Sequence, residues 1–213
     1  VITLTRDPVT FYISNFIQRH ASVLPDVLAW QRSRLGTAAG AEIDHAQAVQ
    51  NFAAELASII ASVDVNDGDE ALELARNRWP DHPFVAQEVK ACLRPLTWFD
   101  TEITGIFGLD ILTSPELRRC GWVVLENDWV EILALRFEQL NALVPKIAEF
   151  VGRPKLSLGQ RNVTSYKPGA WTCKAAMEAA FATPIGRAYV RQLRGSAYAR
   201  ACGYDQPSDI PTS

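Results

Sequence analysis

The pattern of apolar and polar positions predicts a short strand followed directly by a helix at the start of the chain. Residues 1–5 form an apolar run rich in β-branched side chains, and the cation Arg6 follows it. Asp7 fits an N-cap and Pro8 fits the first helical position. Apolar residues then recur at helical spacing, at Val9, Tyr12, Ile13, Phe16 and Ile17. The strand therefore delivers an arginine to its carboxyl end, the edge where open α/β sheets bind ligands.

Helical spacing continues through the next third of the chain. A polar interval over residues 32–44 precedes a strong amphipathic helix over about 44–63, and an acidic turn over 64–69 ends it. Further helices are predicted over about 71–78, 84–93 and 96–106, with breaks at Trp79-Pro80 and at Pro95.

The periodicity then changes from helix to strand. Residues 122–125 and 129–137 read as strands that are joined by a turn over 126–128. A helix over about 141–151 ends at Gly152, and a polar loop covers 159–169. Helices are predicted over 171–182 and about 184–201, and the proline-containing tail from 205 to 213 is expected to fray. Strands interspersed with helices predict an α/β chain.

Composition and charge favour a protein with a sizeable core and argue against a nucleic-acid-binding or membrane-spanning protein. The chain has 213 residues, 48% of them hydrophobic, and a net charge of −3. This content supports a sizeable core, and the charge argues against a general nucleic-acid binder, which needs a basic face. No apolar run reaches the roughly 20 residues of a membrane span.

The cysteines give no sign of a metal site. Cys92, Cys120, Cys173 and Cys202 are widely scattered, and no Cys-x-x-Cys or Cys/His cluster is present. We interpret them as buried free thiols, typical of a reducing compartment, and expect a cytoplasmic protein.

Residues 1–20 resemble the segment that binds the 3′-phosphate in sulfotransferases that use the donor PAPS (3′-phosphoadenosine 5′-phosphosulfate). The similarity rests on the apolar strand, the Arg-Asp-Pro sequence, the apolar helix, and Ser14 at eight positions after Arg6. The family's matching arginine and serine hold the 3′-phosphate, which implies that role for Arg6 and Ser14. One guanidinium and one hydroxyl, about two helical turns apart, suit such a group. The alternative is a surface arginine and a solvated serine.

Two later segments are similar to further landmarks of this family. Residues 132–140 and 144–153 look like the late core strand and the helix that follows it, with Gln139 in place of the usual aspartate. Arg136 and Glu138 at the strand end can pair with each other or with a loop, and a structural clamp is the favoured interpretation. Residues 159–167 stand where the family has a basic loop over the nucleotide. They lack its Arg-Lys-Gly sequence, so Arg161 and Lys167 are the candidates for that role, and a merely basic loop is the alternative.

Residues 98–102, 107–110 and 196–200 resemble, more narrowly, a bacterial sulfotransferase-like group associated with capsular polysaccharide synthesis. Together these similarities imply a P-loop-like three-layer fold with a parallel sheet, rich in helix and incomplete at its N-terminus. They imply one sulfotransferase-like domain over residues 1–204 with a helical insert at about 36–95, and a flexible tail over 205–213.

The resemblance implies transfer of a sulfuryl group from PAPS to a hydroxyl of a carbohydrate or another small acceptor, without a metal. Because the chain opens within a core strand, we expect it to be the C-terminal portion of a longer polypeptide that carries the 5′-phosphosulfate loop. We therefore expect little turnover from this portion alone. The rival hypotheses are a P-loop nucleotide kinase or phosphotransferase, and a helical interaction module without chemistry.

No residue is assigned as catalytic. Proton removal from an acceptor needs a histidine or a carboxylate near it. His20, His45 and His82 read more readily as solvated or structural. Asp100 and Glu102 flank the aromatic pair Trp98-Phe99, which fits either a sugar acceptor or core packing.

Overall fold

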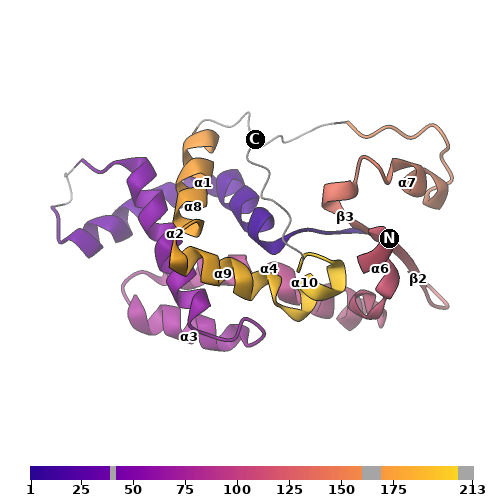
Figure 1. Cartoon of the computed structure of the whole chain (residues 1–213), viewed down its shortest axis with the longest axis horizontal. Coiled ribbons are helices and arrows are strands. Elements are labelled where there is room, and N and C mark those ends of the chain that lie inside the picture. Colours follow the sequence, from indigo (N-terminus) through magenta and orange to yellow (C-terminus); the bar gives the residue numbers. More distant parts are fainter. Residues whose placement is uncertain (39–41, 160–168, 206–213) are drawn as a thin grey trace. The chain divides into compact units, whose positions relative to one another are not determined.

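A computed structural model describes residues 1–38, 42–159 and 169–205, and it shows a helix-rich α/β chain (Figure 1). The α/β class is as predicted. Contacts divide the chain into two units, which are described one at a time. Unit 1 comprises the described residues of Val1–Pro8, Arg94–Arg161 and Arg194–Ser213, and unit 2 comprises those of Val9–Leu93 and Asn162–Leu193. The single domain with an insert stays a prediction.

The first strand is followed by a long run of helices, and two consecutive strands and further helices come after it. The strands are β1 (Ile2–Thr5), β2 (Trp122–Glu126) and β3 (Glu131–Arg136). The α-helices are α1 (Pro8–Leu35), α2 (His45–Ala61), α3 (Gly68–Arg78), α4 (Pro83–Trp98), α5 (Gly105–Phe107), α6 (Pro115–Cys120), α7 (Val144–Phe150), α8 (Ala170–Phe181), α9 (Pro184–Arg194) and α10 (Ala197–Cys202). The described residues also form a π-helix, η1 (Phe99–Thr104), and two 3-10 helices, η2 (Ile111–Thr113) and η3 (Phe137–Gln139).

The sheet of unit 1 has the strand order β1-β3-β2 and is mixed. β1 pairs with β3 in parallel, so Thr5 lies beside Arg136, whereas β2 pairs with β3 in antiparallel fashion. In the described sheet, the expected parallel pairing is thus found between β1 and β3, whereas β2 departs from it. The physical reason is the short turn after Glu126, because a parallel pair needs a crossover of a dozen or more residues.

One face of this sheet is covered by α7. Leu133 and Leu135 of β3 are buried against Leu143 and Ile147, and the cover extends over β2 through partly buried Trp122. At the β1 side the cover ends, and Ile2 and Leu4 are each 42% exposed. β1 and β2 are the two outer strands of the described sheet.

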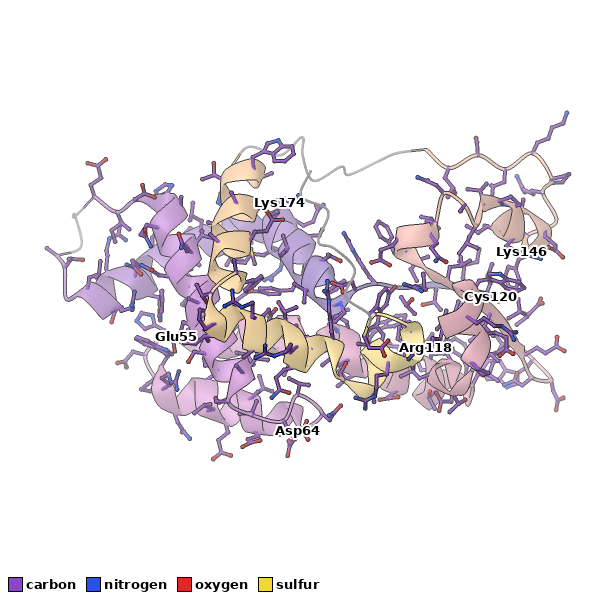
Figure 2. The ribbon with its side chains drawn as sticks, viewed as in Figure 1. Glu55, Asp64, Arg118, Cys120, Lys146 and Lys174 are labelled. Atoms are coloured by element: carbon purple, nitrogen blue, oxygen red, sulfur yellow. The ribbon has the colours of Figure 1, made fainter. Side chains whose placement is uncertain are left out.

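An aromatic cluster forms the core of unit 2. Trp30 of α1 lies edge-on to Phe52 of α2 at 5.3 Å and to Trp79 at 5.4 Å, and Phe52 stacks on Phe84 at 5.2 Å. Trp30 and Phe52 are almost fully buried. Glu55 of α2 (Figure 2) accepts a hydrogen bond from the indole N–H of Trp79 at 3.0 Å, which fixes the rim of the cluster.

A buried carboxylate joins α1 to α4 within unit 2. Glu88 is 3% exposed and accepts two hydrogen bonds from the Arg19 guanidinium, at 2.6 and 2.9 Å. The hydroxyl of Tyr12 donates a third, at 3.2 Å. Burial raises the pKa of Tyr12 well above its ordinary value, so this hydroxyl keeps its proton. The carboxylate is therefore fully partnered, as a buried charge must be.

The break predicted at Trp79-Pro80 is confirmed, since α3 ends at Arg78, whereas the break predicted at Pro95 is wrong. α4 continues through Pro95 to Trp98, and α1 runs through Pro25 to Leu35, four residues into the expected polar interval. A proline removes one backbone hydrogen bond, and burial of side chains before and after it outweighs that loss. The last predicted helix is in fact two, since Ser196 caps α10 by accepting from the N–H of Ala199.

The described thiols are free, and three of the four cysteines are buried as expected, whereas Cys120 is exposed. In the described ranges, no helix has both the length and the apolar character needed to cross a bilayer.

Gly186 is expected to be intolerant of a side chain because α9 approaches the end of α8 there. A Cβ atom at this position would lie 2.2 Å from the carbonyl oxygen of Ala180 and 2.4 Å from the Cα of Phe181, both backbone atoms. We predict that Gly186→Ala lowers the free energy of unfolding by about 1–3 kcal/mol, measured by urea denaturation. Gly68→Ala is the matched control, because its Cβ would meet only Leu93 Cδ1 at 3.9 Å. Equal stability of the two variants would contradict the assigned packing.

Candidate functional site

The carboxyl ends of β1 and β3 lie side by side in unit 1, and a cluster of charged and aromatic side chains gathers there. The register places Thr5 opposite Arg136, so Arg6 and Asp7 leave the sheet beside Phe137 and Glu138. These residues come from segments about 130 positions apart in the sequence. We call them, together with Arg136, Arg194, Tyr198 and Tyr204, the strand-end cluster.

Arg6 is held at its backbone by Tyr198 of α10. The Tyr198 hydroxyl accepts from the N–H of Arg6 and donates to its carbonyl oxygen, both at 3.0 Å. The guanidinium carbon lies 4.4 Å from the centre of the Phe137 ring, within cation–π range. Burial lowers the pKa of Arg6, while the charges of Glu138 and Asp7 act in the opposite direction. A half-buried, oriented cation therefore sits at this edge of the sheet.

Glu138 links the two strand ends to the C-terminal segment. Its Oε1 accepts from the N–H of Asp7 at 2.9 Å, and its Oε2 accepts from the hydroxyl of Tyr204 at 2.8 Å. The Tyr204 hydroxyl also lies 3.1 Å from Thr5 Oγ1, which is fully buried. Burial raises the pKa of Tyr204 far above its ordinary value, so the phenol stays a donor at all physiological pH values.

Asp7 has its own cation. Arg194 Nε donates to Asp7 Oδ2 at 3.0 Å, and both side chains are largely buried, at 12% and 6% exposure. The predicted start of the helix at Pro8 is confirmed. The carboxylate of Asp7 is therefore bound from the C-terminal segment, which secures the junction between β1 and α1.

Arg136 and Glu138 act as a clamp, and both contact residues near the C-terminus. Arg136 Nη2 donates to the carbonyl oxygen of Gly203 at 3.3 Å, and its guanidinium carbon lies 4.9 Å from the centre of the Tyr204 ring. Arg118 of α6 (Figure 2) adds a parallel attachment through the carbonyl oxygen of Arg200, at 2.7 Å. The sequence left open whether Arg136 and Glu138 pair with each other or with a loop, and these contacts show pairing with a loop.

The other predicted ligand-binding residues lie in unit 2 or outside the described residues. Arg6 belongs to unit 1 and Ser14, on α1, to unit 2, so their convergence on one phosphate stays a prediction. Arg161 and Lys167 lie outside the described residues.

Of the candidate bases, His45, Asp100 and Glu102 are exposed, whereas His20 and His82 are half-buried. In unit 2, burial and the nearby charge of His45 lower the pKa of His20, and His82 packs edge-on against Trp79 and Phe84. In unit 1, Phe99 is buried and stacks on Tyr198 at 5.9 Å, which favours the core-packing interpretation of the Trp98-Phe99 pair. Within the described ranges, no group of three potential ligands is placed to hold a metal ion.

Sequence reasoning missed Arg194, Tyr198 and Tyr204 as members of the cluster. The only relevant signal was the weak similarity over residues 196–200, and it gave no role to the tyrosine. Their partners are between 66 and 199 positions away, so no local spacing could reveal them.

Comparison with known proteins adds no family to this picture. No family model matches the chain, and no curated protein or solved structure shows significant similarity to it.

The hydroxyl of Tyr204 is expected to stabilise the strand-end cluster. We predict that Tyr204→Phe lowers the free energy of unfolding by about 1–2 kcal/mol, because it removes a buried donor to a carboxylate. Combining it with Glu138→Gln in a double-mutant cycle should give a coupling of at least about 0.5 kcal/mol. Glu149→Gln on α7 is the control, since Glu149 pairs with Lys146 at the surface and should not couple to Tyr204. Additive effects of Tyr204→Phe and Glu138→Gln would show that the contact does not stabilise the fold.

Proposed function

We propose that the strand-end cluster binds the 3′-phosphate of a nucleotide, and that the chain is part of a PAPS-dependent sulfotransferase with a P-loop-like core. The acceptor would be a hydroxyl of a carbohydrate or another small compound. The observation that carries the proposal is the position of Arg6 at the carboxyl end of β1, next to the parallel strand β3 and at the start of a helix. That edge is the ligand-binding edge of α/β sheets.

The charges of the cluster support an anionic ligand. Three guanidinium groups, of Arg6, Arg136 and Arg194, stand against two carboxylates, of Asp7 and Glu138. Both carboxylates have donors within the protein: Asp7 accepts from Arg194, and Glu138 accepts from a backbone N–H and from Tyr204. A phosphate at the cluster therefore meets a net positive charge, to which the Arg6 guanidinium contributes.

An aromatic contact orients the guanidinium of Arg6. The Arg6 guanidinium lies over the Phe137 ring, and Phe137 is 39% exposed, so this pair stands at the solvent boundary rather than in the core. A cation that is oriented before binding loses less conformational entropy when the ligand arrives. In the proposed enzyme, Arg6 and Ser14 hold the 3′-phosphate, and Arg161 and Lys167 are proposed as further cations for the nucleotide.

Calorimetry with adenosine 3′,5′-bisphosphate tests the proposal directly. Arg6→Ala should weaken the affinity roughly tenfold or more, because a charge-assisted contact contributes about 1.5–3 kcal/mol. Ser14→Ala should act in the same direction with a smaller effect. Arg76→Ala is the control, since Arg76 is an exposed arginine of α3 in unit 2.

Adenosine 5′-monophosphate separates recognition of the 3′-phosphate from general attraction of anions. The intact chain should prefer the bisphosphate, and Arg6→Ala should remove most of that preference. Absence of bisphosphate binding would favour the helical interaction module. An equal loss of affinity for both nucleotides would place the arginine elsewhere on the ligand.

A further inference from the structure

The outer edge of β2 is an open backbone edge in unit 1. The N–H of Arg136 donates to the carbonyl oxygen of Gly121 at 2.7 Å, and the N–H of Asn127 donates to that of Val130 at 3.0 Å. Because hydrogen-bonded pairs alternate in an antiparallel ladder, Val123 and Leu125 bond to β3 between these two points. Trp122, Val124 and Glu126 therefore direct their N–H and C=O groups away from β3. No strand of the described chain pairs with them.

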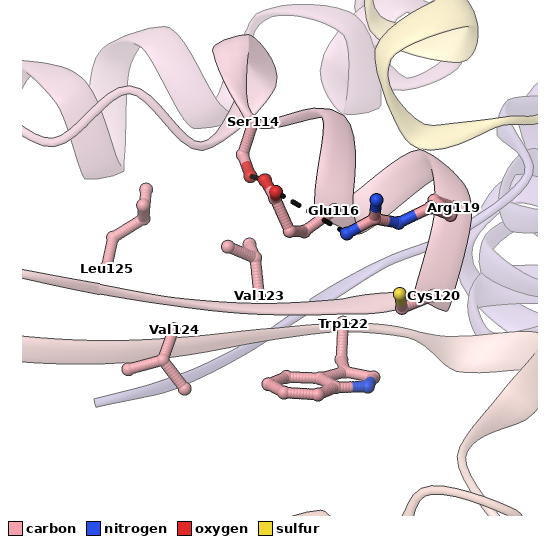
Figure 3. A pocket seen from close by; sticks show the side chains of 8 residues that line it. All are labelled: Ser114, Glu116, Arg119, Cys120, Trp122, Val123, Val124 and Leu125. Carbon is pink, nitrogen blue, oxygen red and sulfur yellow. Dashed lines mark hydrogen bonds and ion pairs between the residues drawn. The ribbon is translucent and has the colours of Figure 1, made fainter.

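A hollow of about 360 Å³ runs along this edge (Figure 3). Four consecutive strand residues line it, together with side chains from α6 and the residue before it: Trp122, Val123, Val124, Leu125, Ser114, Glu116, Arg119 and Cys120. In Figure 3, Val123 and Leu125 point to the side of Glu116, and Trp122 and Val124 point to the opposite side. Successive side chains of a strand project from opposite faces of the sheet. A single hollow that touches four of them in a row must therefore lie along the edge of the strand, where a further strand would pair.

The sequence of β2 does little to block such pairing. Natural outer strands are protected by proline, by lysine or by a bulge, and the strand Trp-Val-Val-Leu-Glu has none of these. Val124 at its centre is 36% exposed. The edge is thus both apolar and regular, which favours addition of a strand.

We propose that β2 pairs in antiparallel fashion with β2 of a second copy of this chain, around a two-fold axis at Val124. In this register all five residues of each strand are paired, Val124 lies opposite the partner's Val124, and Trp122 lies opposite the partner's Glu126. Shifting the axis to Glu126 would put two glutamates opposite each other, which is destabilising. The two sheets become one continuous sheet.

Charge complementarity favours a second copy as the occupant. Lys146 of α7 (Figure 2) has its Nζ 4.6 Å from the centre of the Trp122 ring, so a cation lies over the residue that faces the partner's Glu126. Trp122 and the partner's Glu126 share a face of the extended sheet, because opposed residues project to the same side. Each copy thereby offers a lysine to the glutamate of the other, twice per dimer by symmetry. A ribbon this short buries less than about 1,200 Å², so the dimer is a weak one.

Sedimentation velocity over a range of protein concentrations tests the dimer. Val124→Pro should weaken dimerisation at least tenfold without disturbing the β2–β3 ladder, because the N–H it removes faces outward. Leu4→Pro is the matched control on β1: the N–H of Leu133 donates to the carbonyl oxygen of Val1 at 2.9 Å, so the N–H of Leu4 also faces outward, at the opposite edge. The control should dimerise normally.

A charge exchange provides a second test that does not depend on proline. Glu126→Lys and Lys146→Glu should each weaken the dimer several-fold, and the double variant should restore it. A protein that is monomeric at all concentrations would overturn the proposal. So would a dimer that Leu4→Pro abolishes and Val124→Pro spares. If Val124→Pro does not fold, as judged by circular dichroism, failure of the double variant to restore dimerisation overturns it equally.

Discussion

The parallel pairing of β1 with β3 is the constraint on which the rest of unit 1 depends. It joins the first residues of the chain to a strand about 130 positions later, and parallel register brings both carboxyl ends to one edge. Two polar junctions, Arg6-Asp7 and Phe137-Glu138, must then leave the sheet beside each other. Their charges and backbone donors have to be satisfied locally, and the C-terminal segment does this through Arg194, Tyr198 and Tyr204. The chain thus closes on itself at the place where a ligand is proposed to bind.

The cluster holds the fold together, and the proposed binding is assigned to one cation within it. The carboxylates and the tyrosine hydroxyls point toward one another and hold strand ends together, as their short hydrogen bonds require. The guanidinium of Arg6 lies over the ring of Phe137, which is 39% exposed. A stability measurement on Tyr204 and a binding measurement on Arg6 therefore address different parts of one site.

Local patterns predicted the elements better than their connections. The strand before Arg6, the helix start at Pro8 and the apolar face of α2 are encoded within a few residues, and burial of Val9, Tyr12 and Phe16 is as expected. The break predicted at Pro95 is wrong, because side-chain packing stabilises α4 on both sides of the proline, and the local sequence does not show that packing. The antiparallel hairpin of β2 and β3 was within reach, since its turn is too short for a crossover. Tyr198 and Tyr204 could not be predicted as members of the cluster, because their hydrogen bonds join positions that no sequence periodicity relates.

The proposed dimer and the proposed phosphate site are compatible, because they use different borders of the same sheet. The dimer uses the lateral edge of β2, whereas Arg6 follows β1, which is two strand spacings away, or about 10 Å. Arg6 also lies beyond the carboxyl end of its strand, so a strand added beside β2 does not cover it. The antiparallel axis at Val124 would direct the two phosphate sites of a dimer toward opposite ends of the joined sheet. Nucleotide affinity should therefore be independent of protein concentration, and a dependence would mean that the two borders are coupled through β3, the strand that contacts both.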